Sequence, residues 1–167
     1  NGFWEDIGTV RSYYEVSLAM TDDVPPFEFH DPDQPIYTHR RALPGAKISS
    51  AEIDHTIICS GVKIEKAKIF RSIIGIRSVI REDAIIKESI LCGADTFESE
   101  PIRHPSGIPM GIGKGSYIER AIIDHNARIG EDVTIIGSDK LSNSDGNGYS
   151  IRDGIVVVHK NAVISDG

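Results

Sequence analysis

The sequence predicts a mainly β protein whose core is a left-handed parallel β-helix, and three observations support this fold class. Isoleucine is abundant while aromatic residues make up only 7% of the chain, and β-branched side chains favour pleated strands. Apolar residues recur every six positions from about residue 48 onward. A proline-rich stretch separates this repeat from a short helical pattern at the start of the chain.

The six-residue spacing is the strongest of these signals. The lead residues of the repeat are Ile58, Ile64, Ile74, Ile80, Ile123, Ile129, Ile135, Val158 and Ile164. Four places after a lead stand the small or β-branched residues Val62, Ser78, Ala84, Ala127, Val133 and Ala162, and Lys68 breaks this pattern. Such hexapeptide repeats are typical of a left-handed parallel β-helix, in which three units form one coil and stacked coils bury ladders of apolar residues. A β-sandwich would instead alternate at period two between frequent turns.

Three zones divide the chain. Residues 1–20 form the first, in which Thr9 can cap a helix whose apolar face carries Val10, Tyr14 and Leu18. Because the chain starts without methionine, we expect this zone to be the C-terminal remnant of a catalytic domain. We further expect the helix to pack against that preceding domain.

Residues 21–47 form the second zone, which we interpret as an extended but ordered linker. Its prolines exclude a long helix or a central strand. They are Pro25, Pro26, Pro32, Pro35 and Pro44. The interleaved aromatic residues Phe27, Phe29 and Tyr37 are not typical of a free linker.

Residues 48–167 form the third zone, the predicted β-helix domain. Two stretches interrupt its repeat, residues 93–115 and residues 137–154. Insertions in a solenoid project from one corner as loops and often form contact surfaces, so we expect loops at both places.

Charge and composition narrow the classes of partner. The net charge is −7, and no block of lysine or arginine is present, so nucleic acid is a poor candidate partner. No apolar run approaches the roughly 20 residues that a membrane span needs. Cys59 and Cys92 lack metal-ligand or redox spacing, which favours two reduced thiols in a cytoplasmic protein. The same absence of ligand spacing holds for His30, His55, His104 and His159.

The start of the chain carries the most specific chemical signal. Residues 2–9 read Gly-Phe-Trp-Glu-Asp-Ile-Gly-Thr. This segment resembles the strand-to-helix corner of sugar-1-phosphate nucleotidyltransferases. The resemblance implies that Asp6 is a catalytic residue and a ligand of the cofactor Mg²⁺. A divalent ion held by carboxylates screens the phosphate charges in such chemistry, so a second carboxylate is expected from the preceding domain.

The resemblance extends over nearly the whole chain, and it is closest to the plant and cyanobacterial glucose-1-phosphate adenylyltransferases. The matching segments are residues 27–32, 35–38, 41–44, 72–78, 93–95, 121–130 and 154–162. It implies a tetrameric parent enzyme that makes ADP-glucose and pyrophosphate from ATP and glucose 1-phosphate for glycogen or starch-type synthesis. It also implies subunit contacts and an allosteric site in the β-helix. The fragment alone is expected to be inactive.

The same resemblance points to residues that bind phosphorylated metabolite effectors. Arg41 matches a linker arginine of the plant-type pattern, and Lys160 matches a C-terminal lysine. His125 stands where the pattern has a second lysine, and His39 stands where it has a glutamine. Histidine is mostly neutral near pH 7, so we expect weaker binding that strengthens toward pH 6. We also expect Arg41, His125 and Lys160 to meet in the assembled protein.

Other functions are compatible with the repeat. A hexapeptide acyltransferase would use a histidine base and an acyl-CoA or acyl-carrier donor, but it has no use for the corner around Asp6. A non-catalytic regulatory subunit could share the whole architecture. A nucleotidyltransferase acting on another sugar or base is also open, because those selectors lie upstream.

Overall fold

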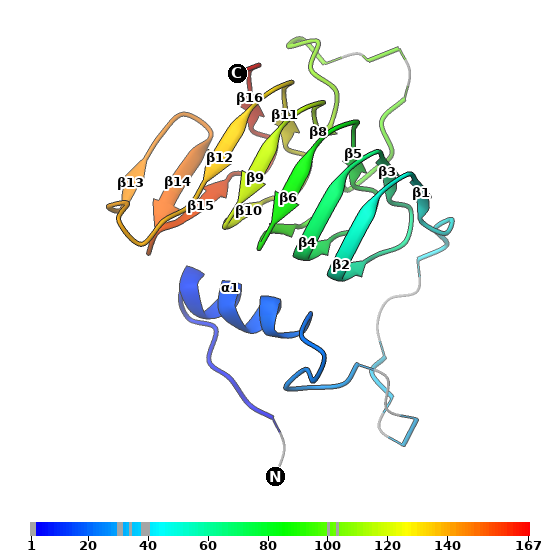
Figure 1. The fold of residues 1–167 in the computed structure, drawn as a ribbon, viewed down its shortest axis with the longest axis vertical. Coiled ribbons are helices and arrows are strands. Elements are labelled where there is room, and N and C mark those ends of the chain that lie inside the picture. Colours follow the sequence, from blue (N-terminus) through cyan, green and yellow to red (C-terminus); the bar gives the residue numbers. More distant parts are fainter. Residues whose placement is uncertain (1–2, 30–31, 34, 38–40, 100, 103) are drawn as a thin grey trace.

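The protein is a parallel β-helix preceded by one helix and a linker, as predicted. We describe it from a computed structural model, which covers residues 3–29, 32–33, 35–37, 41–99, 101–102 and 104–167. Short strands follow one another around stacked coils, and successive coils pair in parallel (Figure 1).

The coils have three faces. The first face is a six-stranded sheet made of β1 (Lys47–Ser49), β3 (Lys63–Glu65), β5 (Val79–Ile80), β8 (Gly111–Ile112), β11 (Arg128–Ile129) and β16 (Val163–Ile164). The other two faces share one sheet, because β2 (Glu52–Ile58) and β4 (Lys68–Ile74) each continue across a corner. The second face then holds β6 (Ile85–Lys87), β9 (Tyr117–Glu119) and β12 (Thr134–Ile136). The third holds β7 (Ile90–Leu91), β10 (Ala121–Ile123) and β15 (Ile155–Val158).

Apolar ladders fill the interior of the coils. Ile64, Ile69 and Ile74 lie on the three successive faces of one coil, and all three are almost fully buried. These residues are five positions apart rather than six, so the coil is one residue shorter at each of these corners. The small residue of the repeat lies two places before a ladder residue. Before Ile69 that position is occupied by the buried Ala67, and not by Lys68. This explains why Lys68 departs from the expected pattern and is exposed.

Both interruptions of the repeat project from the coils as expected, but each of the two predicted stretches also contains β-strands. The first ends before residue 111, because Gly111 and Ile112 already form β8 on the first face. The second contains β13 (Ser144–Asp145) and β14 (Tyr149–Arg152), an antiparallel hairpin that continues the third face beyond β15. Tyr149–Arg152 forms a strand because its backbone pairs with all four residues of β15.

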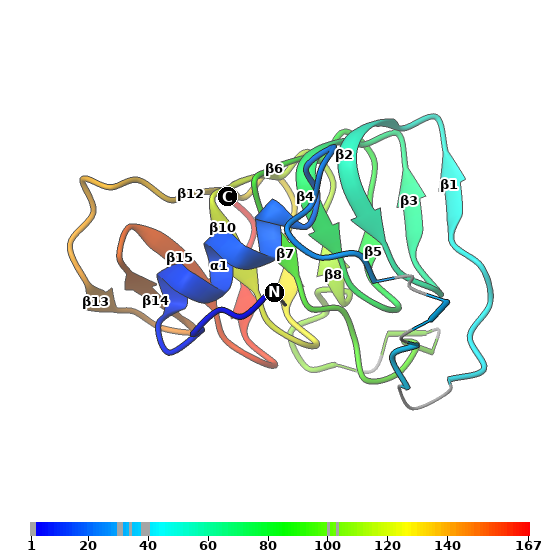
Figure 2. The ribbon, with the colours of Figure 1, turned by 90° about the horizontal axis from the view of Figure 1, so that it is seen from below.

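The helix α1 (Val10–Ala19) begins as predicted. Thr9 caps it, and Thr9 and Ser12 form a reciprocal capping box. The expectation that its apolar face meets another domain is wrong for this chain, because Tyr14 and Leu18 are buried against the β-helix. The helix lies across the third face, where β7, β10 and β15 present apolar side chains outward (Figure 2).

The linker contains neither helix nor strand in the part that the structure describes before β1. The linker residues Phe27 and Phe29 contact each other with ring centroids 5.7 Å apart, and the ring of Phe3, from the first zone, lies 6.4 Å from that of Phe27. The domain boundaries at residues 20 and 47 stay predictions. Within the described residues, no helix has the length and apolar character needed to cross a membrane.

Candidate functional site

The corner that carries Asp6 is preorganised by its own backbone. The Gly8 N–H donates a hydrogen bond to Oδ1 of Asp6, at 3.1 Å. A Cβ at Gly8 would lie only 3.3 Å from the same oxygen, so glycine at this position avoids a close contact with the Asp6 carboxylate. The side chain is exposed, and the described residues bring no pair of further metal-ligating groups to it. Asp6 is therefore suited to supply one ligand of a metal site, and not a whole site.

The predicted effector residues His125 and Lys160 lie at the same corner of successive coils, where the third face turns into the first. The Asn161 N–H donates to the carbonyl oxygen of His125, at 2.9 Å. Asn126 and Asn161 therefore occupy equivalent positions on successive coils, which stack about 4.8 Å apart. His125 and Lys160, the residues before them, are neighbours for the same reason. The structure thus brings together two of the four predicted effector residues.

Both basic side chains at this corner have carboxylate partners. Lys160 Nζ lies 2.8 Å from Asp95 Oδ2, and His125 Nδ1 lies 3.0 Å from Asp124 Oδ1. The Lys160 ammonium, followed by the Asn126 amide, holds the pKa of the Asp95 carboxyl below its ordinary value. The Asp95 carboxylate in turn raises the pKa of Lys160. An anion binding at this corner would compete with Asp95 for the Lys160 ammonium group.

Arg41 lies elsewhere in the chain. Five hydrogen-bonded steps from coil to coil link Pro44 to Asn161, a separation of about 24 Å along the axis. Arg41 precedes Pro44 by three residues, which span at most about 10 Å. Within one chain the structure therefore does not bring Arg41 to Lys160, and His39 lies outside the described residues.

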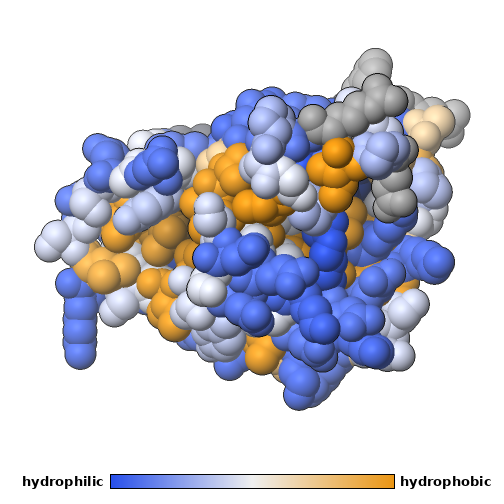
Figure 3. All heavy atoms as spheres, turned by 90° about the horizontal axis from the view of Figure 1, so that it is seen from above, coloured by the Kyte–Doolittle hydropathy of each residue, from blue (hydrophilic) through white to orange (hydrophobic). Residues whose placement is uncertain are grey.

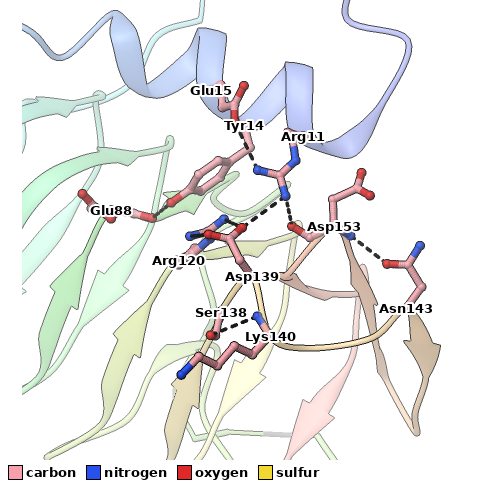
Figure 4. Close-up of polar contacts among 10 residues, drawn as sticks. All are labelled: Arg11, Tyr14, Glu15, Glu88, Arg120, Ser138, Asp139, Lys140, Asn143 and Asp153. Carbon is pink, nitrogen blue, oxygen red and sulfur yellow. Dashed lines mark hydrogen bonds and ion pairs between the residues drawn. The ribbon is translucent and has the colours of Figure 1, made fainter.

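A polar contact that the sequence did not indicate ties α1 to the β-helix (Figure 4). Nη2 of Arg11 lies 3.3 Å from Asp139 Oδ1 and donates to the carbonyl oxygen of Asp153 at 2.6 Å. Arg120 donates to the same Asp139 carboxylate from the opposite side. The Arg120 and Arg11 guanidinium groups hold the pKa of Asp139 below its ordinary value. We call Arg11, Arg120 and Asp139 the helix clasp.

A second basic region lies beneath the excursion that precedes β8. A hollow of about 380 Å³ there is lined by Lys63, Arg77 and Arg81, among other residues. Arg77 stacks on Phe97 with its guanidinium carbon 5.6 Å from the ring centroid. Arg81 donates to the carbonyl oxygen of Met110 at 3.1 Å, so these arginines brace the excursion. Arg77 lies two coils from His125 and three coils from Lys160, so the six-residue spacing alone does not connect these arginines with the effector residues.

One group of metal-ligating side chains gathers in the described part of the chain, and it includes a predicted effector residue. Ligand atoms of Cys92, Asp124 and His125 all lie within 4.8 Å of one another. No ligand spacing in the sequence pointed to this proximity, and both cysteines are free thiols, as expected.

Comparison with known proteins agrees with this architecture. Residues 41–167 match the family model of the GLGC left-handed parallel β-helix domain. The glucose-1-phosphate adenylyltransferase small subunit, chloroplastic/amyloplastic, of Triticum aestivum is 44% identical to the chain over 174 aligned residues. The match covers 100% of this chain and 37% of the wheat protein, so the chain spans little more than a third of that relative's length.

The three-faced coil and the family match together define a left-handed β-helix domain, with the predicted handedness. The chain belongs to the GLGC family and corresponds to the C-terminal β-helix portion of a glucose-1-phosphate adenylyltransferase, that is, of an ADP-glucose pyrophosphorylase.

Proposed function

We propose that this chain works as the C-terminal part of an enzyme that makes ADP-glucose and pyrophosphate from ATP and glucose 1-phosphate, in glycogen or starch-type synthesis. The observation that carries the proposal is the 44% identity to the wheat subunit over the whole chain. The relative is much longer, and the nucleotide-binding groups are assigned to the part of such a protein that precedes the Asp6 corner. The match to the GLGC model favours this reading over the acyltransferase alternative.

Asp6 is proposed to hold Mg²⁺ together with a carboxylate from that preceding part. The Gly8 N–H engages Oδ1, which orients the carboxylate and leaves Oδ2 available as an oxygen ligand. Mg²⁺ is a hard cation that prefers such oxygen ligands, and when bound it neutralises phosphate charge. Thr9 caps α1 directly after this corner, so the packing of α1 on the β-helix sets where Asp6 points.

The test uses the longer enzyme that carries this chain. Asp6→Asn should reduce pyrophosphate release by about 100-fold or more while leaving the fold intact. Glu5→Gln is the matched control, because it changes the neighbouring exposed carboxylate and should keep near-normal turnover. Equal losses in both variants would remove the metal role from Asp6. The 167-residue chain alone should release no pyrophosphate.

The same assay addresses the remaining alternatives. A non-catalytic regulatory subunit would show no turnover in the longer protein even with Asp6 intact. Turnover with another nucleotide or sugar phosphate, but not with ATP and glucose 1-phosphate, would change the assigned substrates. The wheat relative is chloroplastic/amyloplastic by name, so it lends no support to the cytoplasmic expectation, which stays a prediction.

We also propose that the corner of His125 and Lys160 binds phosphorylated metabolites, as the resemblance implies. The Lys160–Asp95 pair is half-exposed, and exposed ion pairs contribute little to stability, so an anion can compete with Asp95 for Lys160. Since Arg41 belongs to the opposite end of the coil stack, Arg41 and His39 are assigned to such a site only across a subunit contact.

Self-association, as a homotetramer, is part of the proposal. A hollow of about 310 Å³ at the last coils is lined mainly by apolar residues that include Ile136, Leu141 and Tyr149. Hydrophobic patches also lie between hydrophilic areas on the face shown in Figure 3. Exposed apolar surface of this kind is typical of protein contacts. Light scattering of the longer enzyme should give the mass of a tetramer, and a monomer would contradict the proposal.

A further inference from the structure

The corner that follows β7 and β10 brings Cys92 together with Asp124 and His125, which lie more than 30 positions further along the chain. Leu91 pairs with Ile123, and the Cys92 N–H donates to the carbonyl oxygen of Ile123 at 2.9 Å. Cys92 and Asp124 therefore occupy the same position on successive coils. His125 is the next residue, at the turn of the corner.

The three side chains converge closely. A thiol, a carboxylate and an imidazole each place a ligand atom within 4.8 Å of the other two, and all three residues are partly buried. Nδ1 of His125 lies 3.0 Å from Asp124 Oδ1, and the His125 backbone N–H donates to the same oxygen at 2.6 Å. Asp124 thus fixes the imidazole on the side that faces Cys92.

The surroundings support a defined site at this corner. Cys92 packs against the apolar cluster that includes Tyr14 and Leu18 of α1. The nearby Lys160 is ion-paired to Asp95 at 2.8 Å, so its charge is compensated. The corner is therefore covered by α1 on one side and carries no uncompensated lysine that would repel a cation.

The combination of ligands selects a class of metal. Sulfur and imidazole nitrogen with one carboxylate oxygen suit Zn²⁺ and related transition ions, whereas Mg²⁺ and Ca²⁺ prefer oxygen alone. Bond lengths of 2.0–2.3 Å imply ligand atoms about 3.5 Å apart in a tetrahedral site. The ligand atoms of this corner already lie within 4.8 Å of one another, so metal binding would require only small side-chain rotations.

We propose that Cys92, Asp124 and His125 form a binding site for Zn²⁺ or a similar divalent transition metal, with a fourth position open to water or an external ligand. On binding, the Cys92 thiol gives its proton to the solvent and the thiolate sulfur bonds to the metal. The metal-bound imidazole of His125 stays neutral, so metal occupancy removes this residue as a cation for effectors. The site is thus separate from Asp6 and opposes the proposed effector role of His125.

The test is a titration of the full chain with Co²⁺ as a spectroscopic probe, followed by competition with Zn²⁺. We expect one saturable site whose absorption includes a thiolate-to-cobalt charge-transfer band. Cys92→Ser should abolish that band and weaken binding by at least about tenfold. Cys59→Ser is the matched control, because Cys59 is the other partly buried free thiol and has no ligating neighbours of this kind among the described residues.

A second readout does not depend on any variant. Saturating Zn²⁺ should protect Cys92 from alkylation, measured by mass spectrometry, while Cys59 stays reactive. Two further variants, Asp124→Asn and His125→Gln, should each weaken Co²⁺ binding while the charge-transfer band survives at high metal concentration. The proposal is overturned if no saturable binding occurs, if the band depends on Cys59, or if Zn²⁺ protects neither or both cysteines.

Discussion

The Arg11 guanidinium and the Asp139 carboxylate, 128 positions apart in sequence, lie 3.3 Å from each other. Asp139 stands at the start of the second insertion, and it also accepts hydrogen bonds from Arg120, the residue after β9. A residue of an inserted segment therefore joins the helix that follows the Asp6 corner to the wall of the β-helix. This makes the second insertion a structural connection and not a solvated excursion.

We expect Asp139→Asn to loosen α1 without unfolding the coils. The substitution removes the charge that both guanidinium groups share, so among the described residues Arg11 keeps only Glu15, within its own helix, as a carboxylate partner. Amide exchange in α1 should become several-fold faster while exchange in β4 and β10 stays unchanged. Asp153→Asn is the control, since only the backbone carbonyl of Asp153 takes part in the contact. Equal exchange rates in the two variants would show that the clasp does not hold the helix.

Tyr14 holds α1 on the β-helix in two ways that can be separated, through burial of its ring and through a hydrogen bond of its hydroxyl group. The Tyr14 hydroxyl donates to the carbonyl oxygen of Glu88 at 2.6 Å. Tyr14→Phe should lower the free energy of unfolding by about 1 kcal/mol, the usual effect of one lost hydrogen bond. Tyr14→Ala should cost about 3–5 kcal/mol, because it also removes a buried ring. Denaturant titrations that give the same value for both variants would contradict this division.

Close stacking of the coils makes some glycines irreplaceable. A Cβ at Gly75 would lie 2.2 Å from the carbonyl oxygen of Cys92, whereas a Cβ at Gly45 would meet nothing within 4 Å. Gly75→Ala must push two coils apart and should destabilise the fold by at least about 2 kcal/mol. Gly45→Ala should be neutral within about 0.5 kcal/mol. Thermal denaturation of the two variants checks the comparison, and similar midpoints would contradict the stacking argument.

The sequence predicted the elements that depend on a local pattern. The period of six identified the coil, and the β-branched ladder is buried as expected, because each ladder residue meets its equivalents on the neighbouring coils. Thr9 was recognised as a helix cap from its position before an apolar stripe. These features follow from residues that are near one another in sequence.

The features that depend on coil register could not be predicted in this way. The insertion before β8 places Cys92 and Asp124 32 positions apart, although they stack as direct neighbours. The partner of Arg11 lies in an interruption of the repeat, so no periodicity pointed to it. The docking of α1 also required knowing which β-helix face carries outward apolar residues such as Ile90 and Ile122. A five-residue spacing, as between Ile64 and Ile69, also shifts all later ladder positions by one residue relative to a strict period of six.

The Asp95–Lys160 pair should make stability depend on pH at both extremes. The folded pKa of Asp95 is lowered by Lys160 and Asn126, so its contribution is present above the unfolded pKa of about 4 and is lost as pH falls through the lower folded value. The folded pKa of Lys160 is raised by Asp95, so its contribution is present below about pH 10 and is lost as pH rises through the folded value.

Asp95→Asn should therefore lower the melting temperature slightly at neutral pH and remove part of the fall on the acid side. Both groups are exposed, so the effect is small. Asp83→Asn is the control, because Asp83 is also exposed and at a corner with positive φ, a conformation that asparagine tolerates. Parallel acid profiles for the Asp95 variant and the unchanged chain would show that the pair is not formed in solution.

Substitutions at the corner of His125 and Lys160 should change anion binding in opposite directions. Lys160→Ala should weaken binding of inorganic phosphate to the longer enzyme by about tenfold, the usual effect of a lost charge-assisted hydrogen bond. Asp95→Ala should strengthen it, because Lys160 loses the carboxylate that competes with the anion at 2.8 Å. His125→Lys should also strengthen it, by adding a permanent charge, while abolishing the metal site. Lys140→Ala is the control, because this exposed lysine forms no ion pair with a carboxylate among the described residues. Calorimetry that finds equal losses for Lys160→Ala and Lys140→Ala, or no gain from Asp95→Ala, would exclude an effector site at this corner.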